Sequence, residues 1–532
     1  MKKMAQRSAR IKFTLKRVKG FLSALRRSKR GMFGVAIIVI AVFVALAAPL
    51  LTPYNPLFTY NLAGTLVPPG WARYLPGGGG LTLNLFAVDE ASLLQSANAL
   101  SKFNVTVTPS NVTQDVSVQQ SEFGTSESNG SLMITFQTAG LPINSSLTVQ
   151  ITRDFYYPYS GIPGAMSPQG SILLSRMEGV AVSPTLIFVQ KWPTFSPQHV
   201  ASYNTTQFEF GQYWENPNVP GPVAYSNDNY TSPTASAAGL SWIIPKVIPQ
   251  STPLYESSGD SITLKQLFPK AGTYSYGISL TVTKLAANAG AVVYVNNLNL
   301  NLLGSSWGFL GTDPQGRDVF TQLVYGTQVS LYVGLTAAFF ATFIGLFVGL
   351  VAAYMGGIVD EVLMRFTDAL LVLPTLPLMI VLILALSGGQ YNINILIIVF
   401  GALGWQGFAR VVRSQVLSLK ERPYVEAAKA VGAGTPYILW RHILPNVVVL
   451  IYVTLALTVP AAIVTEAAFS FLGFIDLAHM SWGRMLTTLV NTPSIWWIVV
   501  PPGLAIMILS LSFILIGYAI DDILNPKLRT RR

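Results

Sequence analysis

The sequence predicts a polytopic α-helical membrane protein with an inserted extracellular domain of the β-sandwich type. Three observations lead to this fold class. Half of the 532 residues are apolar and only 11% are charged, whereas soluble domains carry about 25% charged residues. Six apolar runs are each long enough to cross a hydrocarbon core of roughly 30 Å. Between the first and second runs, residues 81–303 are rich in Ser, Thr, Asn, Gly and Tyr.

The first apolar run extends from Met32 to Leu51 and predicts a transmembrane helix over residues 31–52. The preceding residues 1–30 carry twelve Lys or Arg and no acid. A signal peptide is the alternative, but the run is long for one, and the prolines that follow make a poor cleavage site. A nucleic-acid binder is also basic, but here the basic residues flank apolar runs. We therefore expect a retained helix with a cytoplasmic N-terminus.

The inserted domain is predicted over residues 71–306. Short runs alternate between apolar and polar residues, which is typical of antiparallel strands between turns. Such a pattern, repeated along one domain, favours a β-sandwich. The runs begin at five positions: Val105, Leu132, Leu147, Ile278 and Val292.

The inserted domain also holds every Asn-x-Ser/Thr sequon of the chain, a motif that is glycosylated on external surfaces. The alternative is that a stretch rich in Asn, Ser and Thr produces sequons by composition alone. The candidate residues are Asn104, Asn111, Asn129, Asn144, Asn204 and Asn229.

The remaining five apolar runs predict a membrane domain over residues 307–524. They extend over residues 329–354, 362–386, 393–416, 447–472 and 497–520. With the first run they make six crossings, so both termini lie on one side. The tail 525–532 and the loop 417–442 are basic, whereas the loop 387–392 carries no charge. The positive-inside rule therefore places both termini in the cytoplasm of a plasma-membrane protein and residues 52–326 outside.

No catalytic or metal-binding motif is present in the sequence. The absence of cysteine excludes disulfides, zinc–thiolate sites, iron–sulfur clusters and thiol catalysis. The three histidines lie far apart, and no Gly-x4-Gly-Lys-Ser/Thr loop is present to cradle a phosphate. We predict no catalytic residue, no metal site and no cofactor in this chain.

The most informative segment is cytoplasmic and predicts two short helices over residues 423–437. Pro423 suits the first position of a helix, and Glu426 lies in the first turn, where a carboxylate meets the positive end of the helix dipole. Gly432 is suited to ending the helix, and Pro436 permits a second start. Such an element fits a groove on a cytoplasmic partner, although an amphipathic connector would have the same features.

This segment resembles a known signature. Glu426-Ala427-Ala428-x3-Gly432-x10-Ile443-Leu-Pro445 is similar to the coupling helix of ABC importer permeases, which docks on the ATPase subunit. Pro423, Tyr424 and Pro436 lie in the same segment. The resemblance implies the type I ABC importer permease fold.

Other motifs resemble the C-type permease of oligopeptide and dipeptide (Opp/Dpp) importers. They begin at Ala48, Gly311, Tyr354, Ser470, Ser481 and Pro502. The resemblance covers about residues 1–70 and 307–532. It does not extend to residues 71–306, because in the family the first crossing leads almost directly to the Gly-Thr-Asp segment.

The resemblance implies a subunit that forms half of a translocation pore for peptides or oligosaccharides. The partners it implies are a second permease, two ATPase subunits that bind ATP and magnesium, and an extracellular substrate-binding protein. Two other functions remain open from the residues: an ion-coupled secondary transporter, or a membrane-anchored surface receptor. Neither of them explains the Glu-Ala-Ala segment.

Several residues outside this segment are further candidates. Glu466 lies inside an apolar run, where an ionisable residue points to function; it faces a pore, pairs with a neighbouring subunit, or lies near the outer water. Ser481 and Trp482 fit either a gate or an interfacial anchor. Asp360, Glu361, Arg365 and Asp368 predict ion pairs at the inner interface.

The inserted domain admits two interpretations: contact with a docked binding protein, or a spacer without a ligand of its own. Its aromatic residues suit stacking on sugars or peptides, but aromatics more often fill a β core. They include Tyr156, Tyr157, Tyr159, Trp192, Trp214 and Trp242.

Overall fold

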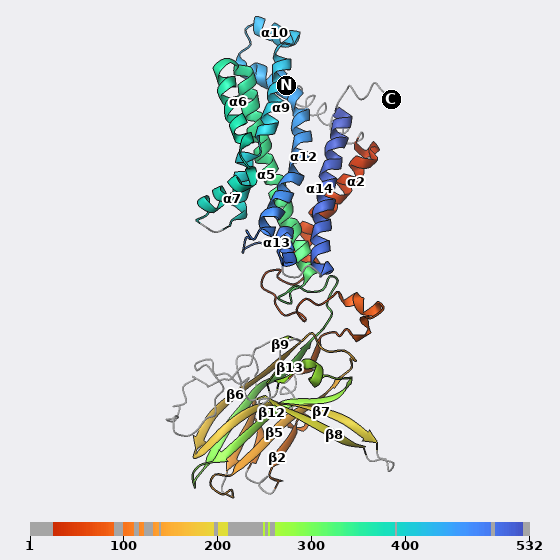
Figure 1. Cartoon of the computed structure of the whole chain (residues 1–532), viewed down its shortest axis with the longest axis vertical. Helices are drawn as coiled ribbons and strands as arrows, with labels where there is room; N and C mark the ends of the chain where they lie inside the picture. The colour runs from red at the N-terminus through yellow and green to blue at the C-terminus, as the bar shows by residue number, and fades with distance from the viewer. Residues whose placement is uncertain are drawn as a thin grey trace, which may run out of the picture. The chain divides into compact units, whose positions relative to one another are not determined.

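The chain folds into two compact units (Figure 1). The computed structural model describes residues 25–89, 99–110, 116–121, 131–137, 140–195, 201–210, 248–249, 254–255, 261–388, 391–490 and 495–524. The first unit, here called the helical unit, consists of Met1–Thr59 and Val319–Arg532. The second, here called the β unit, consists of Tyr60–Asp318.

Helices make up most of the helical unit. They are α2 (Lys29–Leu51), α5 (Val319–Met355), α6 (Gly357–Val372), α7 (Thr375–Leu386), α8 (Ile393–Leu403), α9 (Gln406–Lys420), α12 (Leu444–Phe471) and α14 (Trp496–Leu524). The shorter elements are α10 (Pro423–Ala430), α11 (Thr435–Ile438), the π-helix η7 (Leu439–Ile443), α13 (Trp482–Leu486) and the 3-10 helix η8 (Thr487–Val490). In the described part of the chain, five helices are long and apolar enough to cross a membrane, or six if the bent pair α6–α7 counts as one crossing.

The predicted crossing over residues 362–386 is not one straight helix. It divides into α6 and α7, which meet at an angle of 95°. The break falls at Leu373, which has extended backbone angles, and at Pro374. The proline explains it, because its ring disfavours helical geometry in the preceding residue and it lacks an N–H group. At 1.5 Å per residue α7 is about 18 Å long, too short to cross a bilayer unaided.

Small residues of α5 allow the helices of this unit to approach closely. A β-carbon on Gly349 would lie 2.5 Å from the carbonyl oxygen of Ala409 in α9, and one on Gly345 would lie 2.7 Å from that of Trp405. Only glycine fits at these two positions, since any side chain would push a neighbouring backbone away. A β-carbon on Gly334 would instead meet the side chain of Ile463 in α12, at 2.8 Å.

The β unit consists of antiparallel strands. They are β1 (Leu85–Val88), β2 (Asn104–Thr108), β3 (Val116–Ser121), β4 (Ser131–Gln137), β5 (Ser146–Tyr157), β6 (Ala165–Glu178), β7 (Val180–Phe195), β8 (Ala201–Phe210), β9 (Ile248–Pro249), β10 (Leu254–Tyr255), β11 (Ser261–Ile262), β12 (Gly272–Lys284) and β13 (Gly290–Leu303). All five alternating runs of the sequence lie in strands, namely in β2, β4, β5, β12 and β13.

Two sheets share one hydrophobic core in the β unit. One sheet has the order β3-β4-β13-β6-β9, with β1 also paired to β13, and the other has the order β2-β5-β12-β7-β8. The core contains buried residues of both sheets, such as Leu132 and Val293 from the first and Ile151 and Ile278 from the second. The period of two puts these residues on the inner face of each sheet.

Aromatic residues fill one part of this core. Tyr157 and Tyr274 are fully buried and pack against Phe268 and Phe188. Burial raises the pKa of the Tyr274 phenol to about 12. Of the aromatics considered for stacking on a ligand, Tyr157 is therefore a core residue, whereas Tyr156 is 63% exposed. Tyr159 is half-buried against the core; the side chain of Trp192 and all of Trp214 and Trp242 lie outside the described residues.

The segments that flank the predicted insertion are joined to each other within the β unit. The backbone N–H of Trp307 donates to the carbonyl of Pro68, and that of Gly70 donates to Trp307. Further along, the Thr312 hydroxyl donates to the carbonyl of Gly64 at 2.6 Å. The unit therefore begins at Tyr60 and ends at Asp318, beyond the predicted bounds of 71–306, because its two ends are hydrogen-bonded together.

This closure predicts that the insertion can be removed without unfolding the helical unit. Joining Gly70 to Trp307 through a short glycine linker keeps the paired ends, so we expect the melting temperature of the detergent-purified protein to shift by only a few degrees. A deletion of 71–250 is the control, since it leaves β12 and β13 without partners, and it is expected to aggregate. An unfolded 71–306 deletion would contradict the prediction.

Candidate coupling surface

The helix α10 starts and ends as its sequence predicts. Pro423 occupies its first turn, with the carbonyl of Arg422 accepting from Val425 and Glu426. At the C-terminus, Gly432 has a positive φ of 81°. Its N–H donates to Lys429, while the N–H of Ala433 donates to the carbonyl of Ala428. This is the Schellman pattern, which requires a left-handed residue and so favours glycine at position 432.

Buried apolar side chains anchor the short helices to the rest of the unit. Val425 of α10, Ile438 of α11 and Ile443 of η7 are buried in one cluster with Phe408 and Val412 of α9. Ala428 is half-buried against the same cluster. The segment is therefore fixed to α9 on one side rather than loose.

The opposite side of the segment is open. Glu426, Ala427, Gly432 and Pro436 are exposed, as is Pro423 at the start of α10. Tyr424 is 43% exposed and its ring lies 6.0 Å from that of His442. A carboxylate on the first turn of a helix, surrounded by small and aromatic residues, presents a contact surface of low side-chain entropy. We call residues 423–437 the coupling segment.

An apolar cleft lies beside the coupling segment. It has a volume of about 360 Å³ and is lined by Phe343, Leu346, Phe347 and Leu350 of α5, together with Pro436, Leu439, Trp440 and Leu444. Pro436 therefore has a place in the wall of this cleft as well as at the start of α11.

Glu466 lies inside the helical unit, with 1% of its surface exposed. Its carboxylate accepts a hydrogen bond of 2.9 Å from the Ser470 hydroxyl, and the Ser481 hydroxyl lies beside it. The sequence left three locations open for this side chain: a pore face, a subunit interface or the outer water. In the structure the side chain is instead buried by other residues of its own chain. Burial raises the pKa of the nearby Tyr391 phenol, and the Glu466 and Asp476 carboxylates raise it further.

Ser481 and Trp482 start the short helix α13. The Ser481 hydroxyl caps it by accepting from the N–H of Arg484 at 3.1 Å. Trp482 is 3% exposed, donates from Nε1 to the carbonyl of Leu323 at 2.9 Å, and packs on Gly326 of α5. Trp482 is therefore packed between helices and is not an exposed anchor at the membrane interface.

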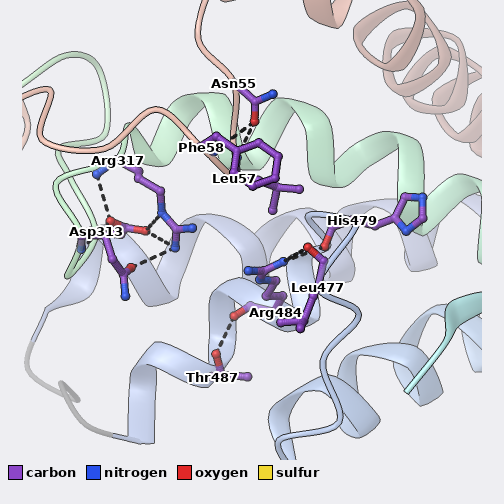
Figure 2. A network of polar contacts seen from close by, with 10 residues as sticks. Asn55, Leu57, Phe58, Asp313, Arg317, Leu477, His479, Arg484 and Thr487 are labelled. Atoms are coloured by element: carbon purple, nitrogen blue, oxygen red, sulfur yellow. Dashed lines mark hydrogen bonds and ion pairs between the residues drawn. The ribbon is translucent and has the colours of Figure 1, made fainter. Parts of the chain in front are cut away.

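The loop before α13 is held by one guanidinium group. Figure 2 shows Arg484 directed at the carbonyl groups of Leu477 and His479, while the hydroxyl of Thr487 donates back to the carbonyl of Arg484. In the β unit, the Asp313 carboxylate binds Arg317 in a similar compact turn, at 2.6 Å (Figure 2). Asp313 and Arg317 belong to the motif that begins at Gly311, and Arg484 to the motif that begins at Ser481.

The acidic residues of α6 have partners that the sequence did not identify. Asp360 pairs with Arg413 of α9 at 2.5 Å, and Asp368 pairs with Arg410. Two arginines, Arg410 and Arg413, three apart inside an apolar run, are a signal that points to buried ion pairs, but it does not identify their partners. Glu361 and Arg365 are 4.0 Å apart and exposed on α6.

Two candidate glycosylation residues are exposed, and the others lie wholly or partly outside the description. Asn104 and Asn144 are exposed in the β unit. The side-chain amide of Asn104 donates to Asp154 at 3.1 Å. Asn111, Asn129, Asn229 and the side chain of Asn204 lie outside the described residues. Glycosylation stays a prediction.

Among the described residues, no group of three or more His, Cys, Asp or Glu side chains is placed to hold a metal ion.

Comparison with known proteins identifies the helical unit. Residues 342–530 match the family described as binding-protein-dependent transport system inner membrane component, and residues 17–69 match the N-terminal transmembrane domain of oligopeptide transport permease C. The matches leave most of the β unit uncovered.

Individual relatives agree with these families. The dipeptide transport system permease protein DppC of Bacillus subtilis is 40% identical over 234 residues, which span 43% of this chain and 72% of the relative. The oligopeptide permease OppC of the same species is 39% identical over 239 residues, 44% of this chain and 76% of the relative. A solved structure of the MetNI methionine ABC transporter is similar with a TM-score of 0.31 at 20% identity, covering 39% of this chain and 95% of that chain.

The similarity to the two permeases extends over more than two thirds of their length, and the residues that match the transport family include the coupling segment and α13. The multi-pass helical unit and the sequence motifs agree with them. The chain therefore belongs to the family of ABC transporter permeases of the oligopeptide and dipeptide (Opp/Dpp) type.

Proposed function

We propose that this chain forms half of the translocation pore of an ATP-driven importer and that the coupling segment transmits the work of the ATPase subunits. The substrate class we propose is oligopeptides or dipeptides, with oligosaccharides as the second class. ATP and magnesium bind to the partner subunits, and this chain carries no catalytic residue of its own. A second permease and an external substrate-binding protein complete the assembly.

The observation that carries this proposal is the two-sided construction of the coupling segment. Val425 fixes it to a buried cluster that contains residues of α9 and, just beyond the segment, Ile438 and Ile443, whereas Glu426 and Ala427 are exposed. A contact element that transmits force must be rigidly attached on one side and exposed on the other.

Charge and the arrangement of the helical unit support one orientation in the membrane. The coupling segment lies at one end of this unit and α13 at the other (Figure 1). The basic residues of the loop 417–442 lie with the coupling segment. We infer that this end is cytoplasmic, together with both termini, and that residues 52–326 lie outside.

The proposal is tested by mild purification of the tagged full chain from its native membrane, with identification of every co-purifying protein and small molecule. We expect a second permease, P-loop ATPases and a binding protein that carries a peptide or a sugar. Recovery of the chain alone, also after cross-linking in the membrane, would contradict the importer and favour an ion-coupled transporter or an anchored receptor.

A further inference from the structure

The helix α9 leads directly into the coupling segment. It ends at Lys420, and α10 begins at Pro423. One face of α9 packs on α5, where Phe408 and Val412 meet Gly345 and Gly349. Since the coupling segment is anchored to the buried face of α9, a displacement of the segment is passed first to this helix.

A second face of α9 is joined to α6 by two ion pairs. Arg413 binds Asp360 with two hydrogen bonds of 2.5 Å, one from Nε and one from a terminal nitrogen. Arg410 binds Asp368, two turns further along α6. A bidentate pair fixes direction as well as distance, because the planar guanidinium matches the carboxylate in one geometry.

The ion pair Asp360–Arg413 is largely shielded from solvent, so breaking it is costly. The side chains of Asp360 and Arg413 are only 15% and 34% exposed. Breaking such a pair leaves a partly desolvated charge, which is costly near a membrane. The ring of Phe366 in α6 also stacks on that of Trp405, the residue before α9, with centroids 6.4 Å apart.

The far end of α6 leads to a cavity. After the 95° bend at Leu373 and Pro374, Thr375, Leu376 and Met379 of α7 form one wall. The cavity has a volume of about 280 Å³. Its other walls come from α8, the residue that follows it and α12, with the lining residues Phe400, Leu403, Gly404, Val464, Thr465 and Ala468.

We propose that the pairs Asp360–Arg413 and Asp368–Arg410 carry the displacement of the coupling segment from α9 to the α6–α7 bend, so that α7 moves and changes the cavity it lines. The four residues are positioning residues, and the inference rests on the proposed function. Because α7 follows the proline break and is short, it can rotate about the bend without unwinding α6.

The movement of α7 can be measured with spin labels attached to introduced cysteines, because the chain has no cysteine of its own that would also be labelled. Leu376→Cys and Val464→Cys place two spin labels on exposed positions of α7 and α12 that line the cavity. In the complete reconstituted transporter, we expect the distance distribution between the labels to shift when ATP is added. The shift is expected to vanish in Asp360→Arg and to return in Asp360→Arg combined with Arg413→Asp.

Transport gives the second readout. Asp360→Arg is expected to lower uptake per ATP hydrolysed by at least about tenfold, as expected when one charge of a close pair is reversed. In Asp360→Arg, ATP hydrolysis and co-purification of the ATPase subunits are expected to persist. The double exchange is expected to restore uptake. Glu361→Arg is the matched control, because Glu361 lies on the same helix but is 70% exposed and its partner, Arg365, is 4.0 Å away and also exposed. This substitution is expected to have no effect.

In the transport assay, three results would overturn the inference: unchanged uptake per ATP in Asp360→Arg, a parallel fall of uptake and hydrolysis, or no recovery in the double exchange. If Asp360→Arg does not fold, Asp360→Asn and Arg413→Gln replace it, with the label distance as the readout. If the ATP-dependent label shift persists in Asp360→Arg but is lost in Glu426→Arg, the ion pairs do not carry the displacement, and the proposed function stands. If the distance between the labels in the wild-type protein does not change with ATP, the result counts against the proposed function.

Discussion

Reversal of the charge at Glu426 (Glu426→Arg) is expected to reduce ATP-driven uptake by more than about tenfold while the protein remains folded, because a lost interfacial charge contact costs roughly 2–5 kcal/mol. Glu426 is exposed on the first turn of α10. An arginine there opposes the helix dipole and presents the wrong sign to a docked partner. Uptake into vesicles, set against the amount of folded complex, measures the effect.

The control for this experiment is Glu361→Arg, an equally drastic change at an exposed acid of α6. It is expected to leave uptake and ATPase binding unchanged. If Glu426→Arg retained uptake at the level of this control, with the protein well folded, the coupling role of residues 423–437 would have to be abandoned. An ion-coupled transporter or an anchored receptor would then explain the chain better.

The neighbouring substitution Val425→Asp is expected to act on stability rather than on docking. Val425 is fully buried between α10 and α9, in contact with the apolar side chains of its cluster, so a carboxylate placed there would be buried among hydrocarbon groups. We expect the free energy of unfolding to fall by more than about 3 kcal/mol, the range found when an unpaired charge is buried. Thermal unfolding of the detergent-purified chain measures it.

Val431→Asp supplies the matched control in the same loop, since Val431 is 86% exposed. Its expected effect on the free energy of unfolding is within about 0.5 kcal/mol, as for most surface substitutions. Equal melting temperatures for Val425→Asp and Val431→Asp would show that α10 is not anchored as described. The contrast between positions 425 and 426 thus separates attachment of the segment from its contact with a partner.

Local sequence patterns predicted most elements correctly. The alternating runs became strands, the start of α10 at Pro423 and its end at Gly432 followed from capping rules, and the long apolar runs became helices. These features depend on a few neighbouring residues, so they are legible without knowledge of the rest of the chain. The break at Pro374 was equally local, but the high hydropathy of the run concealed it.

The sequence by itself determined the membrane class of this protein, its inserted β-rich domain and its membership of the permease family, because hydropathy, period and motif are properties of adjacent residues. Only the tertiary structure decided that Glu466 is covered by its own chain, that Arg410 and Arg413 pair with α6, and that the ends of the insertion are joined to each other. Each of these depends on contacts between residues far apart in sequence. Burial and pairing are set by such packing, which no local pattern encodes.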